Sequence, residues 1–94
     1  MASLKDPAEA AAYLNAHLGG GEDESDELFL LALRDVARAI GVGEVAETAV
    51  LGRESLYKAL SKGGNPKLST LRSILKAMGL RLTVDQNQKR RRAS

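Results

Sequence analysis

The sequence predicts an all-α bundle of about five helices followed by one short C-terminal strand. Apolar residues recur at intervals of three and four through most of the chain, which indicates amphipathic helices. Clusters of glycine and proline divide these runs into short segments. Apolar and polar residues alternate near the C-terminus, at residues 80–84, as in a strand. A chain of 94 residues allows one domain with a small core.

The first helix is expected to run from Pro7 to about Leu18. Asp6 is a suitable N-cap, Pro7 suits the first helical position, and Glu9 stands where a capping box places a carboxylate. The helix carries one narrow apolar stripe: Leu4, Pro7, Ala11, Leu14 and Leu18. We expect the glycines at 19–21 to end it and to act as a hinge.

The acidic run at 22–27 leads into a second helix, LFLLALRDVARAI, which Gly41 should end. Two short helices are expected at about 43–50 and 53–62, before a break at 63–66. In the last helix we expect Ser69 as the cap and Gly79 as a left-handed terminator that brings Leu80 against Leu75.

A lone strand at 80–84 is marginal unless it pairs with another edge. Pairing across a two-fold axis with a second copy predicts a homodimer, and docking on the same chain is the alternative. We therefore divide the chain into an N-terminal helix and hinge (1–22), a main domain with the strand (23–84) and a disordered basic tail (85–94).

Charge is distributed unevenly along the chain. Residues 1–52 carry three basic and ten acidic side chains, a net charge of −7, whereas residues 53–94 carry eleven basic and two acidic ones, a net charge of +9. This pattern favours a polyanionic partner for the second half, although folding can bring the two halves together and cancel part of it. We expect no membrane span, no secretory signal and a cytoplasmic location.

The sequence gives little support for an enzyme. His17 is the only histidine, and no serine or carboxylate pair is placed to work with it. The glycines at 19–21 lack the Lys-Ser/Thr of a phosphate loop. With no cysteine in the chain, disulfides and thiolate metal sites are excluded. We predict no catalytic residue, no cofactor and no metal.

The stretch VGEVAETAVLGRESLYKALS, residues 42–61, has the apolar positions of a helix-turn-helix, namely Val45, Ala46, Leu51, Leu56 and Leu60. Together with its flanking helices it resembles the Xre or lambda-repressor class of DNA-binding domains. The strings ALRDVARAIGV and RESLYKALSKGGNPKLSTLRSILKAMGLRL resemble the HigA-like addiction-module antidote proteins more narrowly, and this resemblance covers most of the chain.

The resemblance implies a lambda-repressor-like fold and a repressor that is the antitoxin of a type II toxin-antitoxin module. Such a protein binds double-stranded operator DNA as a homodimer and neutralises a RelE-type toxin. Two alternatives stay open: a stand-alone Xre-type regulator, and a protein-binding module with weakened DNA affinity. The first helix and the acidic stretch from Glu22 to Glu27 are the expected toxin face, unless that helix packs only against the core.

In a helix-turn-helix the second helix enters the major groove, with its N-terminal residues at the base edges. The expected base-reading residues are Arg53, Glu54, Ser55 and Lys58. The expected phosphate contacts are Tyr57, Lys62, Asn65 and Lys67. The tail at 89–92 could add phosphate contacts, and simple solvation is the alternative for all of these side chains.

Three residues depart from the pattern of the family. Glu44 stands where a glutamine usually contacts a phosphate, so that contact is lost or inverted. Val50 stands where a turn glycine is usual, and because a β-branched residue is strained in the left-handed region we expect a remodelled turn. Gly52 replaces the usual hydroxyl cap, at a cost of a few tenths of a kcal/mol. These changes put tight operator binding in doubt.

Overall fold

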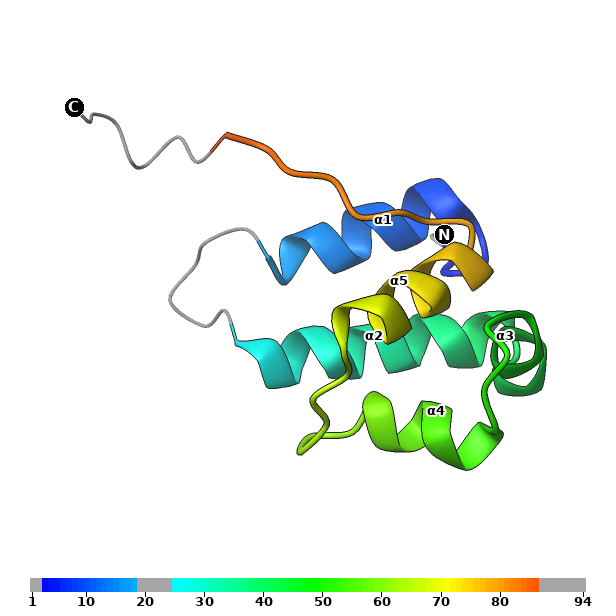
Figure 1. The fold of residues 1–94 in the computed structure, drawn as a ribbon. Coiled ribbons are helices and arrows are strands. Elements are labelled where there is room, and N and C mark those ends of the chain that lie inside the picture. The colour runs from blue at the N-terminus through cyan, green and yellow to red at the C-terminus, as the bar shows by residue number, and fades with distance from the viewer. Residues whose placement is uncertain (1–2, 19–24, 87–94) are drawn as a thin grey trace.

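The computed structural model describes residues 3–18 and 25–86. These residues form five helices and no strand (Figure 1). The helices are α1 (Pro7–Ala16), α2 (Asp26–Ile40), α3 (Val42–Thr48), α4 (Arg53–Ala59) and α5 (Leu68–Ala77). The prediction of an all-α bundle of about five helices is therefore confirmed.

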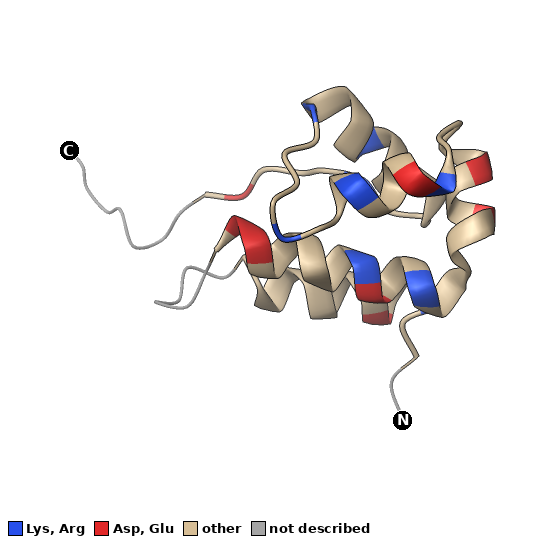
Figure 2. Cartoon of the chain, turned by 90° about the horizontal axis from the view of Figure 1, so that it is seen from below, with Lys and Arg blue, Asp and Glu red and all other residues tan. Residues whose placement is uncertain are grey.

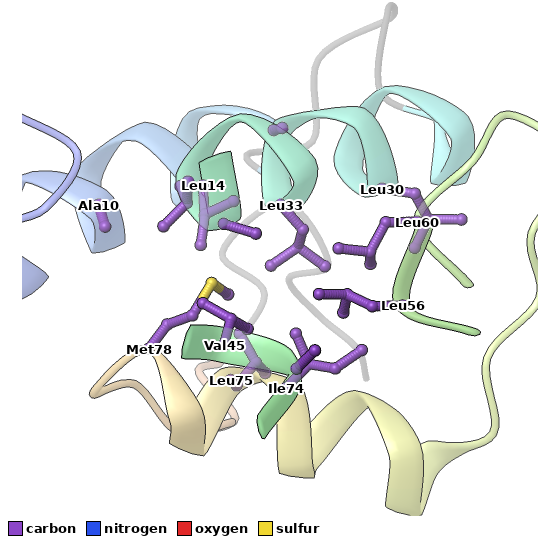
Figure 3. Packing of buried hydrophobic residues seen from close by; sticks show 14 residues of the cluster. Ala10, Leu14, Leu30, Leu33, Val45, Leu56, Leu60, Ile74, Leu75 and Met78 are labelled. Carbon is purple, nitrogen blue, oxygen red and sulfur yellow. The ribbon is translucent and has the colours of Figure 1, made fainter. Parts of the chain in front are cut away.

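Every helix contributes to one buried apolar cluster. Leu33 of α2 and Val45 of α3 are fully buried, and they face side chains of α4 and α5 (Figure 3). Figure 3 labels ten members of this cluster: Ala10, Leu14, Leu30, Leu33, Val45, Leu56, Leu60, Ile74, Leu75 and Met78. The short α3 packs against α2, α4 and α5, so tertiary contacts hold a helix too short to form alone in water.

Helix α1 begins as predicted. The carboxylate of Asp6 accepts a hydrogen bond from the backbone N–H of Ala8 at 3.1 Å, and Pro7 occupies the first turn. The helix ends at Ala16, two residues earlier than predicted. His17 is its C-cap, and its ring lies edge-on to Tyr13 with 5.1 Å between the ring centroids.

A hydrogen bond between side chains joins α1 to α2. The hydroxyl of Tyr13 donates to a carboxylate oxygen of Asp35 at 2.7 Å. This bond, together with partial burial and the negative charge of Asp35, raises the pKa of Tyr13 above its ordinary value. The pair therefore stabilises the contact between the helices while the phenol is protonated.

The start of α5 differs from its prediction. Ser69 was predicted as the cap, but the N-cap is Lys67, and the N–H of Leu71 bonds to the carbonyl of Lys67 at 2.9 Å. Ser69 therefore lies inside the first turn. A side-chain cap contributes about 1 kcal/mol, less than the burial of Ile74 and Leu75, which sets the position of the helix.

The end of α5 is as predicted. Gly79 has a φ of 79°, and the N–H of Leu80 donates to the carbonyl of Leu75 at 2.8 Å. The N–H of Gly79 donates to the carbonyl of Lys76 at 3.0 Å, which completes the two-bond helix terminator. Gly79 also directs the following chain back along α1 (Figure 1).

The predicted C-terminal strand is absent from the described residues. Residues 80–86 are not helical, and they form no strand. A strand needs a second edge for its backbone hydrogen bonds, and the part of the chain that the structure describes offers none. The prediction of a strand is therefore wrong for the described residues, and residues 80–83 instead line a groove against α1.

Candidate functional site

Helices α3 and α4 are joined by the four-residue turn 49–52, in which the backbone is left-handed at Val50. The φ of Val50 is 59°. The N–H of Leu51 donates to the carbonyl of Ala46 at 2.8 Å, and the N–H of Val50 donates to that of Glu47 at 3.1 Å. These bonds are those of a glycine-terminated helix. The expectation of a remodelled turn is therefore wrong: Val50 itself takes the left-handed conformation, with a side chain that is 87% exposed.

Apolar side chains hold the two helices from behind. Val45 and Ala46 of α3 are buried, and so are Leu56 of α4 and the C-cap residue Leu60. Leu51 of the turn is half-buried against the same core. The five apolar positions that predicted this unit therefore all pack inward, which fixes the orientation of the outer face of α4.

The structure places all eight predicted contact residues on the surface. Five of them lie on α4: Arg53, Glu54, Ser55, Tyr57 and Lys58. The other three, Lys62, Asn65 and Lys67, lie on the connection from α4 to α5 and are exposed as well. Figure 2, seen from the side of α4, shows Lys and Arg positions along this helix and its connection to α5. The eight side chains thus lie on one continuous stretch, residues 53–67.

The side chain of Arg53 lies against the first turn of α3. A Cβ atom added at Gly43 would stand 2.6 Å from Nη2 of Arg53 and 3.3 Å from its Cζ. Any larger side chain at position 43 would displace the guanidinium. Gly43 therefore provides the surface on which Arg53 rests, at the N-terminal end of α4.

Tyr57 of α4 contacts a side chain of α2. The guanidinium carbon of Arg34 lies 5.4 Å from the centroid of the Tyr57 ring, in a cation–π contact. The Nε atom of Arg34 is buried and has no hydrogen-bond partner among the described residues. Tyr57 keeps 38% of its surface exposed, so its ring connects α2 to the outer face of α4.

Helix α5 begins beside Lys67 with no side-chain cap. The first N–H groups of a helix without a cap are free to donate to an anion, and the helix dipole favours negative charge there. Together with Lys62 and Asn65, this end of α5 offers donors suited to a phosphate backbone. The site lies next to the connection that follows α4.

Other predicted features lie on α3, at the start of α4 or outside the described residues. Glu44 is exposed in the first turn of α3, and Gly52 is the N-cap of α4, with no side-chain bond. The acidic residues 22–24 and the basic residues 89–92 lie outside the described residues.

Within residues 3–18 and 25–86, no group of His, Asp and Glu is arranged to hold a metal ion. The helices of these same ranges are too short or too polar to cross a bilayer.

Sequence reasoning missed Gly43 and Arg34. The signal for Gly43 was a glycine inside the helical run VGEVAET, where it lowers helix propensity and so indicates close approach by another group. Arg34 gave no comparable signal, because its contact with Tyr57 joins residues 23 positions apart.

Comparison with known proteins places the chain in a family. Residues 1–86 match the family model described as "Probable addiction module antidote protein". A relative from Haemophilus influenzae, described as an uncharacterized protein, is 40% identical over 85 residues, which cover 90% of this chain and 84% of the relative. No solved structure matches the chain. The chain therefore belongs to the family of probable addiction module antidote proteins.

Proposed function

We propose that this protein is the antitoxin of a type II toxin-antitoxin module, and that it represses its own operon through a lambda-repressor-like helix-turn-helix of the Xre type. In this proposal α3 and α4 are the paired helices and α4 reads the operator. The protein acts as a homodimer and neutralises a RelE-type toxin. Membership of the antidote family supports the antitoxin role.

One observation carries the DNA-binding part: α4 turns Arg53, Glu54, Ser55 and Lys58 outward while Leu56 is only 1% exposed behind them. A rigid helix with polar side chains at its N-terminal end suits insertion into the major groove. Arginine can donate two hydrogen bonds to guanine, and a glutamate can accept one from the N4 group of cytosine. The chemistry of the face thus suits base recognition.

The residues after α4 would fix the register of the helix in the groove. Three exposed residues precede the N-terminus of α5, which has no side-chain cap: Lys62, Asn65 and Lys67. Phosphate contacts position a protein without carrying sequence information. In this proposal Tyr57 contributes to the same backbone contacts from the α4 surface, with its ring held by Arg34.

In this proposal the toxin binds α1 and the start of α2. Helix α1 buries Ala10 and Leu14 and leaves most other positions exposed, and α2 begins with the exposed carboxylates of Asp26 and Glu27. A RelE-type toxin that acts on RNA needs a basic surface, so acidic groups on its antitoxin would attract it. This face contains no residue of α4.

The test is a mobility-shift assay with the promoter fragment and a scrambled fragment at two salt concentrations. Replacing Arg53 by alanine should reduce the preference for the promoter by about 1–3 kcal/mol. Replacing Lys62 by alanine should weaken binding to both fragments alike and reduce the salt slope by about one. If both variants behave identically, α4 does not read bases through Arg53.

A protein-binding module with weak DNA affinity is the second candidate, favoured by the exposed carboxylate of Glu44 and the uncapped Gly52. In that case neither fragment would shift at physiological salt, while a toxin encoded beside the gene would still co-purify with the chain. A third outcome, specific DNA binding with no toxin gene beside it, would indicate a stand-alone Xre-type regulator.

A further inference from the structure

The chain that follows α5 has an open backbone edge. The N–H of Leu80 bonds to α5, but within the described chain residues 81–86 form no backbone hydrogen bond. All six of these residues are exposed. An exposed row of free N–H and C=O groups is a template for pairing with another chain.

The side chains of this segment alternate between two chemical kinds. Leu80, Leu82 and Val84 would share one face of an extended chain, because successive side chains point to opposite faces. Residues 80–83 line a groove of about 440 Å³ between α1 and the end of α5, and Leu80 and Leu82 are its apolar members on this segment. Val84 lies beyond the lining of this groove and is 96% exposed, which is unusual for a valine without a partner.

We propose that residues 80–86 pair antiparallel with the same residues of a second copy, about a two-fold axis through Thr83. This inference rests on the homodimer of the proposed function and identifies its interface. In this register Arg81 lies directly opposite Asp85 of the second copy, and the symmetry repeats the pair. Leu82 lies opposite Val84 of the second copy.

Charge selects this register over its neighbours. An axis through Leu82 would set Arg81 against Thr83 and Asp85 against Gly79, so that neither charge has an opposite charge directly across from it. An axis through Val84 would set Thr83 against Asp85 and Leu82 against Gln86. Opposite charges and apolar pairs directly across a strand pair are favourable. Only the axis through Thr83 gives both.

The groove supplies what a two-stranded ribbon lacks. Two paired strands alone are marginal in water and need an apolar surface on one face. Pairing would place Val84 of the second copy beside Leu82, over the groove formed by Ala11, Leu14 and Leu75. Pairing would thus bury Val84 of each copy and cover the groove of the other copy at the same time.

The absence of cysteine from the chain allows a direct cross-linking test on the full protein. Thr83→Cys would place two thiols opposite each other at the axis, where directly opposed Cβ atoms lie about 4.5–5.5 Å apart, close to disulfide geometry. Mild oxidation should convert most of this variant into a covalent dimer. Leu82→Cys should react more slowly, and Thr48→Cys on α3 serves as the control for random collision.

Reaction of Thr83→Cys no faster than that of Thr48→Cys would overturn the pairing. Faster reaction of Leu82→Cys than of Thr83→Cys would overturn the register. These measurements need no DNA, so they test this inference separately from operator reading. If the mobility-shift assays agree with their prediction but Thr83→Cys does not cross-link, α4 remains the proposed reading helix and the proposed dimer interface is rejected.

Exchanging the charges gives an independent test by sedimentation equilibrium. Arg81→Glu and Asp85→Arg should each raise the dimer dissociation constant about tenfold, because each sets like charges opposite each other twice. The double variant should recover the wild-type value. An equimolar mixture of the two single variants should also recover it, since the heterodimer restores both opposite-charge pairs. Failure of both the double variant and the mixture to recover would contradict the proposed Arg81–Asp85 pairing.

Discussion

Val50 adopts a φ of 59°, in the left-handed region where a β-branched side chain is strained. Replacing it with glycine should stabilise the fold by about 0.5–1 kcal/mol, because relief of strain outweighs the added freedom of the unfolded chain. Thermal unfolding followed by circular dichroism would then show a midpoint a few degrees higher. Val50→Ala is the control, since alanine keeps the left-handed strain. If the two variants raise the stability equally, the gain comes from loss of the exposed valine side chain and not from relief of backbone strain.

Tyr13 offers a prediction about pH. Its pKa is raised in the folded chain, chiefly by the hydrogen bond to Asp35, so the neutral phenol is favoured by folding. The resulting stability is present below the pKa of about 10 of the unfolded chain, and it is lost as pH rises through the higher folded value. Tyr13→Phe should cost about 1 kcal/mol at pH 7 and progressively less above pH 10.

Urea unfolding at several pH values would measure this difference. Tyr57→Phe is the matched control, because its contact with Arg34 uses the ring face, which phenylalanine retains. A difference between wild type and Tyr13→Phe that stays constant to the most alkaline pH would mean that the hydrogen bond to Asp35 does not contribute in solution.

At the scale of elements, the connection between α4 and α5 depends on close backbone approach at Gly64. A Cβ atom there would stand 2.3 Å from the carbonyl oxygen of Ala59, whereas one at Gly63 would meet nothing within 4 Å. Gly64→Ala should therefore destabilise the fold by about 1–3 kcal/mol, and Gly63→Ala should change it little. Chemical denaturation of this adjacent pair would check the contrast, and equal midpoints would show that the connection relaxes freely.

The packing of α4 on α3 gives a prediction about recognition. Gly43→Ala should leave the fold as stable as before or slightly more so, because alanine favours helix and the displaced group is a flexible arginine tip. It should nevertheless reduce the preference for the promoter by about 1 kcal/mol, by moving Arg53. The measurement is a double-mutant cycle: the effect of Gly43→Ala should vanish in the Arg53→Ala background. Persistence of the effect would exclude Arg53 as its cause.

Sequence predicted element boundaries best where the signal is local. Asp6 with Pro7, and Gly41 and Gly79, marked helix ends correctly because a cap or a left-handed glycine acts within a few residues. Ser69 misled the prediction of a helix start, because packing of the residues after it determined the position of α5. The inward residues of α3 and α4 were predictable from spacing alone.

At the scale of the whole molecule, features that join distant parts of the chain were not predictable. The contacts of Arg53 with Gly43 and of Arg34 with Tyr57 depend on how helices approach one another, which no local pattern specifies. The prediction of a strand at 80–84 was wrong for the same reason, because a strand there would have to pair with an edge that the described chain does not contain. The exposure of the predicted residues of α4 was nevertheless predictable, because the apolar spacing of this helix determined which of its sides faces the core.

The groove between α1 and the end of α5 has α1 residues on one wall and Leu80 and Leu82 on the other. A toxin lying along α1 and a second copy pairing with residues 80–86 would therefore meet at the same hollow. Thermodynamic linkage is reciprocal: whatever factor the toxin imposes on self-association, self-association imposes on the toxin. The ratio of the two proteins in a cell would then decide how many copies of α4 reach the operator together, and so how strongly the operon is silenced.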